Sequence, residues 1–178
     1  KRKILCEVGG IHIWYLFPCR KQEEQKTLNL CRRCFSQEAL QDTFLLTYDC
    51  MRRYQGTWHL EKKLIFPANV VLESKNEKLL EYEIRQGCDE IGKSREILKI
   101  SPDEENFLRF LCGDKKHVGM SRGVIFEGVT KVTEGPLKGL EAQICKIDRH
   151  KRLARLETPQ GENVRYVLAG LEIMEKVV

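Results

Sequence analysis

The spacing of apolar residues along the first two thirds of the chain predicts alternating strands and helices. Residues 11–17 are rich in β-branched and aromatic side chains and stop at Pro18, which is typical of a strand. Leu28, Cys31 and Phe35 then recur at helical spacing, so we expect a helix from Gln22 to Phe35. Three more short apolar runs predict strands, at residues 44–48, 57–65 and 70–72.

Two further helices are expected in the same region because both carry start signals. Ser74, with Glu77 three residues later, forms a capping-box pattern that opens a helix running to about Gln86. Ser101, followed by Pro and two acidic residues, is a strong start for a helix that ends at Gly113. The order strand, helix, three strands, helix, helix predicts an α+β sandwich with a mainly antiparallel sheet.

From about residue 129 the pattern changes to short β segments separated by turns. Residues 130–133 lead into residues 134–139, a tight turn containing two glycines and one proline. Strand candidates follow at residues 142–147, 153–157, 164–168 and 172–177. About five short strands in ~50 residues are typical of a small β-barrel. We therefore expect a domain at residues 1–116, a polar linker at residues 117–128 with one last strand at residues 124–126, and a barrel domain at residues 129–178.

Charge and hydropathy set limits on the class of protein. Lys and Arg number 31 against 26 Asp and Glu, a formal net charge of +5. This excess permits a nucleic-acid partner without requiring one, so the placement of the charges matters more than their total. Apolar runs fall short of the ~20 residues that cross a membrane. The basic and then apolar start is interrupted at Glu7 and two glycines, too soon for a signal peptide. We expect a soluble, cytoplasmic protein that binds no membrane.

The eight cysteines are scattered without the paired knuckles of a zinc ribbon. Cys31-Arg32-Arg33-Cys34 is the only CxxC, and both thiols fall on the apolar face of the expected helix. A thiol enzyme or a metalloprotein stays open as an alternative that this placement disfavours. We expect neither a functional phosphate-binding glycine loop nor a nucleophile elbow in this chain. We therefore expect no catalytic residues, no metal and no cofactor.

Motifs in both halves resemble those of one family. Residues 131–144, Lys-Val-Thr-Glu-Gly-Pro-Leu-Lys-Gly-Leu-Glu-Ala-Gln-Ile, closely resemble the KOW motif, in which a strand leads through a Gly-Pro turn and a Lys-Gly step to a second strand. Trp14-Tyr15 before a helix, and Phe66-Pro67 before an apolar strand ending at Glu73, are similar to the NGN domain of the NusG family. Residues 97–108 resemble the region that closes NGN domains. Together these features cover nearly the whole chain.

The resemblance implies an N-terminal NGN-type α/β sandwich followed by a small SH3-like β-barrel of the KOW type. The family comprises transcription elongation factors, and residues 118–123, 134–140 and 146–152 are most similar to the LoaP antitermination subgroup, which acts on particular long operons. A monomeric, non-enzymatic factor is thereby implied. Its partners would be RNA polymerase, structured RNA such as a leader hairpin, and non-template DNA.

The resemblance also implies where polymerase binds. The clamp helices of its largest subunit would contact an apolar pocket beside the N-terminal sheet, near Pro18, Asn69 and Val71. Many relatives place an aromatic residue after the Phe-Pro, whereas a buried Asn needs polar partners that an aromatic ring does not need. Trp14 and Phe66 are interpreted as residues of the sheet core.

Basic residues are densest between positions 146 and 155, where the one acidic residue is Asp148. If residues 142–147 pair with 153–157, these cations lie at a hairpin tip and on its flanks. A phosphate backbone favours such convergence because each neutralised phosphate releases condensed counterions, and arginine forks can meet phosphates in pairs. The expected RNA-binding residues are Lys138, Lys146, Arg149, His150, Lys151, Arg152, Arg155 and Arg165.

Two alternatives stay open at this point. The basic turn could be a solvated surface feature kept polar for solubility. The chain could also be a ribosome-associated KOW protein that binds structural RNA, although the helix-bearing N-terminal half with its Trp-Tyr and Phe-Pro pairs argues against that class.

Overall fold

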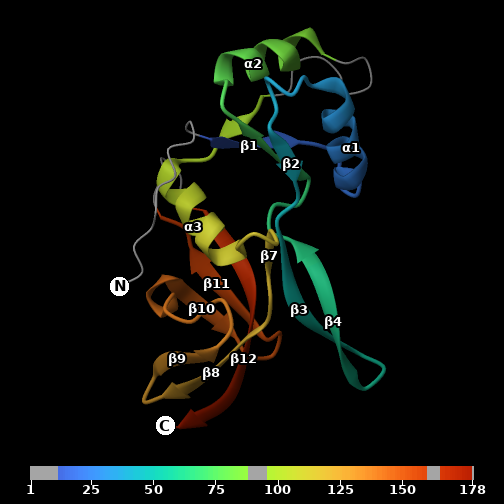
Figure 1. The fold of residues 1–178 in the computed structure, drawn as a ribbon. Coiled ribbons are helices and arrows are strands. Elements are labelled where there is room, and N and C mark those ends of the chain that lie inside the picture. The colour runs from blue at the N-terminus through green and yellow to red at the C-terminus, as the bar shows by residue number, and fades with distance from the viewer. Residues whose placement is uncertain (1–11, 88–95, 160–164, 178) are drawn as a thin grey trace.

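The structure, a computed structural model, describes residues 12–87, 96–159 and 165–177, and the described residues form a mixed α+β fold with three mostly antiparallel sheets (Figure 1). Its first part contains β1 (Ile13–Pro18), α1 (Glu24–Cys34), β2 (Asp42–Phe44), β3 (Thr47–Tyr54), β4 (Thr57–Leu64), β5 (Asn69–Ser74), α2 (Glu77–Gln86), β6 (Leu98–Lys99) and α3 (Pro102–Cys112). The remainder contains β7 (His117–Val118), β8 (Ser121–Phe126), β9 (Val129–Glu134), the 3-10 helix η1 (Glu141–Gln143), β10 (Ile144–Asp148), β11 (Leu153–Glu157) and β12 (Tyr166–Val177). The α+β class expected from the sequence is confirmed.

A four-stranded antiparallel sheet of order β2-β5-β1-β6 organises the N-terminal region. Successive residues of β1 point to opposite faces of this sheet. Tyr15 and Phe17 pack with Leu28 of α1 and Leu80 of α2 in one apolar cluster. Trp14 lies in a second cluster, which contains α3. The strand is therefore buried on both faces.

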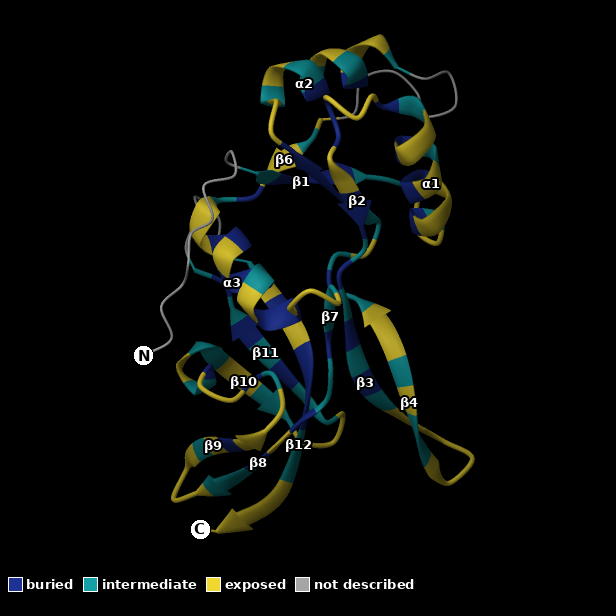
Figure 2. Ribbon diagram, in the orientation of Figure 1, coloured by how far each residue is buried: buried dark blue, intermediate teal, exposed yellow. Residues whose placement is uncertain are grey.

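Helix α3 has the boundaries that the sequence predicted. The Ser101 hydroxyl accepts a hydrogen bond from the Glu104 backbone N–H at 3.3 Å, and the helix ends before Gly113, whose φ is 57°. Figure 2 shows buried and exposed residues on opposite sides of α3. The buried residue Leu111 lies three and four residues after the buried residues Leu108 and Phe107, the spacing of one face of an amphipathic helix.

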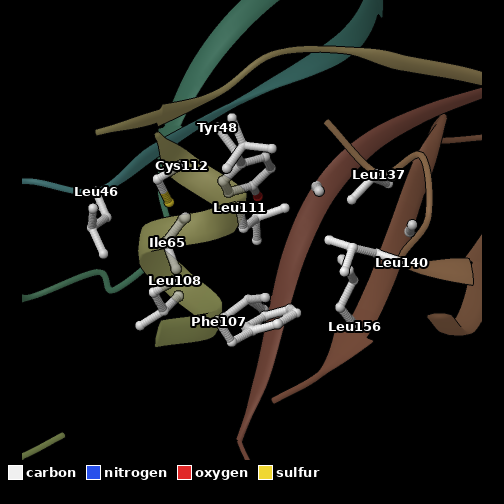
Figure 3. Close-up of a cluster of buried hydrophobic side chains, with 14 of the residues drawn as sticks. Leu46, Tyr48, Ile65, Phe107, Leu108, Leu111, Cys112, Leu137, Leu140 and Leu156 are labelled. Atoms are coloured by element: carbon white, nitrogen blue, oxygen red, sulfur yellow. The ribbon is translucent and has the colours of Figure 1, made fainter. Parts of the chain in front are cut away.

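The apolar face of α3 belongs to a core that both halves of the chain share. In Figure 3, Leu46 of the N-terminal half lies on one side of α3, and Leu137 and Leu156 of the C-terminal half lie on the other. Ile65 of the N-terminal half belongs to the same cluster. All of these side chains belong to one continuous cluster of buried residues. The two regions predicted as domains are thus packed against each other through α3.

A polar network joins α3 to the N-terminal sheet. The Arg109 guanidinium donates hydrogen bonds to Glu73 Oε1 at 2.9 Å and to Glu105 Oε1 at 2.8 Å, and it lies 4.3 Å from the centre of the Trp14 ring. The second Glu105 oxygen accepts from the Trp14 backbone N–H at 3.1 Å. Each charged member is paired, which offsets the desolvation cost of burying it.

The C-terminal strands form a five-stranded sheet of order β10-β11-β12-β8-β9, in which β8 and β12 run parallel. The small β-barrel expected here is observed as an open sheet, which does not close between its edge strands β9 and β10. A depression of about 510 Å³ lies between them. Glu141 also lines this depression, and one of its side-chain oxygens accepts the Val132 backbone N–H at 3.1 Å, so this donor of β9 is satisfied without a strand partner. The pKa of Glu141 is lowered by hydrogen bonds that backbone N–H groups donate to its carboxylate. The largest contribution comes from the backbone N–H of Glu141 itself.

Residues 117–128, predicted as a linker, contain β7 and β8. The short strand β7 pairs with β3 in the three-stranded sheet β4-β3-β7, and β8 enters the five-stranded sheet. The segment therefore connects the two regions as paired backbone. The expected strand at residues 124–126 is part of β8.

The sequence predicted the first residues of α1 and α2 incorrectly. Asn76, and not Ser74, caps α2: its side-chain oxygen accepts from the Leu79 backbone N–H at 3.1 Å, whereas Ser74 still pairs with Ile13 at the end of β5. Helix α1 begins two residues later than expected, because Gln22 has a φ of 72°, which lies outside the helical region.

Strand β3 crosses close to β12 at Gly170. A Cβ atom built on Gly170 would lie 2.5 Å from the Asp49 carbonyl oxygen and closer still to the sulfur of Met120. Met120 is flexible and can move, but the Asp49 backbone is held in the β3–β4 pairing. Because Gly170 has no side chain, the β3–β4 hairpin can lie this close to the C-terminal sheet.

Replacing Gly170 by Ala is expected to destabilise the protein by about 1–3 kcal/mol, the typical cost of forcing an added methyl group into packed surroundings. Chemical denaturation of the full chain measures this change. Gly119→Ala is the matched control, since a Cβ atom there meets nothing within 4 Å. Equal stabilities of the two variants would contradict the close crossing.

Candidate nucleic-acid interface

The predicted hairpin of basic residues is present as β10 paired with β11. Ile147 and Asp148 pair with Ala154 and Leu153, and the intervening turn is closed by a hydrogen bond of 2.9 Å from the Lys151 backbone N–H to a side-chain oxygen of Asp148. The acidic residue that interrupts the basic run thus shapes the turn, as Asp commonly does through its side chain.

Four of the expected RNA-binding residues are exposed together on this hairpin. Arg149, His150 and Lys151 lie in the turn, and Lys146 lies on β10. Lys151 forms an ion pair of 3.8 Å with Asp148, but both groups are solvent-exposed or nearly so, and such pairs are weak. We call these four residues the basic turn.

Two further arginines of the expected set are held against aromatic rings behind the basic turn. Arg152 donates to Glu172 of β12 at 2.7 Å and stacks 4.0 Å from the centre of the Trp58 ring. Arg155 stacks 3.6 Å from the ring of Tyr166. Both side chains are half-buried, and they also join the hairpin to neighbouring strands.

The structure separates Arg165 from this group. Arg165 adjoins Thr158 at the far end of β11 from the basic turn, about 17 Å along a five-residue strand. Its Nε lies 3.8 Å from a carboxylate oxygen of Glu104 on α3. Lys138 is exposed in the turn that follows β9. Arg165 therefore contributes to the contact between α3 and the C-terminal strands.

Sequence reasoning missed two residues that lie beside the basic turn. Arg53 and Trp58, which face each other across the β3–β4 hairpin, line a cleft of about 470 Å³. Its other walls come from Arg149, His150, Arg152, Glu172 and Ile173. A basic residue beside an aromatic one on a strand was the available signal, but nothing local indicates that this hairpin packs next to β12.

The residues expected near a polymerase contact have different exposures. Pro18 and Asn69 are register partners in β1 and β5 and are half-buried. The Asn69 side chain donates to the Pro67 carbonyl at 2.9 Å, which meets its need for a polar partner. Val71 is 1% exposed and belongs to the core, so its side chain is not available to a partner. Trp14 is a core residue, and Phe66 is half-buried against the same core.

The described cysteines lie mainly inside the protein. Cys31 is buried and Cys34 is half-buried on α1. Burial raises the pKa of the Cys50 thiol and raises that of Cys112 to about 12, which opposes thiolate formation. Cys6 and Cys88 lie outside the described residues. Over residues 12–87, 96–159 and 165–177, no group of three or more His, Cys, Asp or Glu side chains is arranged to hold a metal ion.

Within the described parts of the chain, none of the helices has the length and apolar character needed to cross a membrane. Comparison of the sequence with models of known protein families gave no match, and comparison with curated proteins gave none either.

The burial of the Glu104 carboxyl group makes the stability of the protein depend on pH. Burial raises the pKa of Glu104 above its ordinary value of 4.5, and Arg165 opposes this only in part. The folded protein therefore holds the Glu104 proton more tightly than the unfolded chain does. Its contribution to stability is complete below the unfolded pKa and disappears as pH rises through the folded pKa.

Glu104→Gln removes this titration, so the stability of wild type relative to the variant should fall as pH rises from 4 to 8. Urea unfolding of both proteins across this range measures the difference. Asp103→Asn, an exposed neighbour on the same helix, is the control. Parallel pH profiles for wild type and Glu104→Gln would contradict the assignment.

Proposed function

We propose that this protein is a transcription elongation or antitermination factor of the NusG type, which binds RNA through its C-terminal region and RNA polymerase through its N-terminal region. The observation that carries the proposal is the basic turn: four exposed basic residues, Lys146, Arg149, His150 and Lys151, on one paired hairpin. The motif resemblance over both halves connects this surface to transcription.

The basic turn has the properties that a phosphate backbone needs. Its cations are carried by the backbone of a paired hairpin, so this backbone is already ordered before it meets a fixed array of phosphates. Arg152 and Arg155 lie behind them, with their guanidinium planes set by Trp58 and Tyr166. A structured RNA presents phosphates and 2′-hydroxyl groups in a defined geometry. We infer that a folded RNA, such as a leader hairpin, is the partner of this surface.

The local geometry of residues 131–144 supports the KOW assignment. Strand β9 runs into a turn in which Gly135 and Gly139 have φ values of 94° and 87°, a region that favours glycine. Leu137 is fully buried, and its backbone N–H donates to the Ser121 hydroxyl at 3.1 Å. The Gly-Pro-Leu-Lys-Gly sequence thus forms an anchored turn leading from one strand to the next.

The N-terminal surface near Pro18 and Asn69 is the proposed contact for the polymerase clamp helices, with non-template DNA as a further partner. Both residues lie at one end of the β1–β5 ladder and are half-buried, so an apolar helix pair could cover them. Capture of polymerase core by the full chain should be abolished in Asn69→Arg and retained in Asn29→Arg, a substitution at an exposed position of α1, which tests this contact. Capture that is equal for both variants would place it elsewhere.

The RNA proposal predicts the effect of neutralising Lys146, Arg149 and Lys151 together by Ala. Affinity for a structured RNA should fall at least about tenfold, and the slope of log K against log salt should decrease by about 0.7–0.9 for each phosphate that the variant no longer neutralises. Titration of a labelled RNA hairpin at several salt concentrations measures both quantities. All three side chains are exposed, so the fold should be unaffected.

The matched control replaces Arg20, Lys21 and Lys26, three exposed cations in and before α1, by Ala. It removes the same formal charge from the N-terminal region. An equal fall in affinity for the two triple variants would show that only the net charge matters, and it would remove the basic turn as the RNA site.

Recovery of ribosomal RNA alone after crosslinking in cells would favour a ribosome-associated protein instead.

A further inference from the structure

The cleft between the β3–β4 hairpin and the basic turn is built by two hairpins that are distant in sequence. Arg53 and Trp58 contribute one wall from β3 and β4, and Arg149, His150 and Arg152 contribute the other. Figure 1 shows the β3–β4 hairpin extending alongside the C-terminal sheet. The close crossing of β3 over Gly170 fixes this juxtaposition.

The charges that line the cleft leave an excess of positive charge. Among the described residues that line it, Glu172 is the only carboxylate, and this group already lies 2.7 Å from Arg152 and 3.6 Å from Arg122. For Arg53 and Arg149, the structure shows no ion pair with any described carboxylate. Two guanidinium groups from opposite walls can thus bind an anion that enters from solvent.

The remaining walls of the cleft are apolar or planar. Ile173 and the half-buried ring of Trp58 provide apolar surface, and the Arg152 guanidinium stacks on that ring. A volume of about 470 Å³ falls within the ~300–1,000 Å³ typical of sites for small organic groups. The cleft can therefore hold more than a bare inorganic anion.

We propose that this cleft is a binding site for one unpaired nucleotide of the RNA, with its phosphate between Arg53 and Arg149 and its base against Trp58, Arg152 and Ile173. The inference rests on the proposed RNA-binding function and adds the β3–β4 hairpin to that interface. Unpaired nucleotides are the parts of folded RNA whose bases can leave the stack and pack on aromatic rings or arginine planes. A fully paired duplex has no base to offer and meets only the basic turn.

The test compares two RNA probes with the full chain: a 12-nucleotide oligouridylate and a fully paired RNA duplex of the same length. Arg53→Ala should weaken oligouridylate binding about tenfold, the effect of removing a charge-assisted hydrogen bond, and should leave duplex binding unchanged. Arg52→Ala is the matched control. Arg52 is also exposed, but it alternates to the opposite face of the hairpin, where it pairs with Glu61 at 3.5 Å.

Tryptophan fluorescence gives an independent readout. The chain has two tryptophans, and Trp14 is fully buried in the core. Oligouridylate should therefore quench the emission of Trp58, and the quenching should disappear in Trp58→Phe. The duplex should leave the emission unchanged.

The outcomes distinguish the two proposals. Equal oligouridylate affinities for Arg53→Ala and Arg52→Ala, with unquenched Trp58 emission, would overturn the nucleotide site while the basic turn remains an RNA surface. A wild-type chain that binds neither probe at low salt would overturn the proposed RNA-binding function, and the nucleotide site with it. Selective weakening in Arg53→Ala together with quenching supports both.

Discussion

Burial of the apolar face of α3 is the interaction on which the rest of the structure depends. Phe107, Leu108 and Leu111 are buried between strands of both halves, so one helix supplies the apolar surface that neither half covers alone. Each fully buried large apolar side chain contributes about 1.5–3 kcal/mol relative to exposure. The network of Arg109 with Glu73 and Glu105 sets the helix against the N-terminal sheet. The two regions consequently behave as one packed body, with the segment between them pinned as β7 and β8.

This arrangement determines what the surface offers to a ligand. With α3 in place, β3 crosses β12 at Gly170, and the β3–β4 hairpin is held next to the basic turn. Cations from distant parts of the sequence then share one cleft. Arg152 and Arg155 reinforce the site from behind by stacking on Trp58 and Tyr166. The net charge of the chain is only +5, but the fold gathers several basic residues in one place. Such a local concentration of positive charge attracts a phosphate backbone more than the net charge does.

Local chemistry predicted the elements of this fold well where it acted alone. The Ser101-Pro102 start and Gly113 end of α3, the apolar strand that became β1 and the β10–β11 hairpin all follow from short-range signals. Predictions that needed long-range information were less successful. The barrel does not close between β9 and β10, and at the edge of β9 the Val132 backbone N–H is bound by a side-chain oxygen of Glu141, a contact that no strand pattern encodes. Val71 was expected to contact RNA polymerase. Its strand β5 pairs between β1 and β2, and the side chain lies in the core.

In the candidate site, too, residues placed by local sequence signals were predicted, and residues placed by tertiary contacts were not. The exposed cations of the basic turn could be predicted from a dense run of charge, whereas the role of Arg165 depends on Glu104 of α3, which is distant in the sequence. Arg53 and Trp58 could not be assigned from the sequence, because only the tertiary packing of β3 against β12 brings them to the turn.

Native-state hydrogen exchange of the full chain and of Leu108→Ala tests the shared core most directly, since slowly exchanging amides report the free energy of opening in each region. The substitution removes a fully buried side chain of α3 and should cost about 2–5 kcal/mol. The slow amides of β1 and β5 and those of β11 and β12 should become less protected together and by similar amounts. Retention of full protection in β11 and β12, with weaker protection only in the N-terminal strands, would contradict a common core and leave the two halves independent.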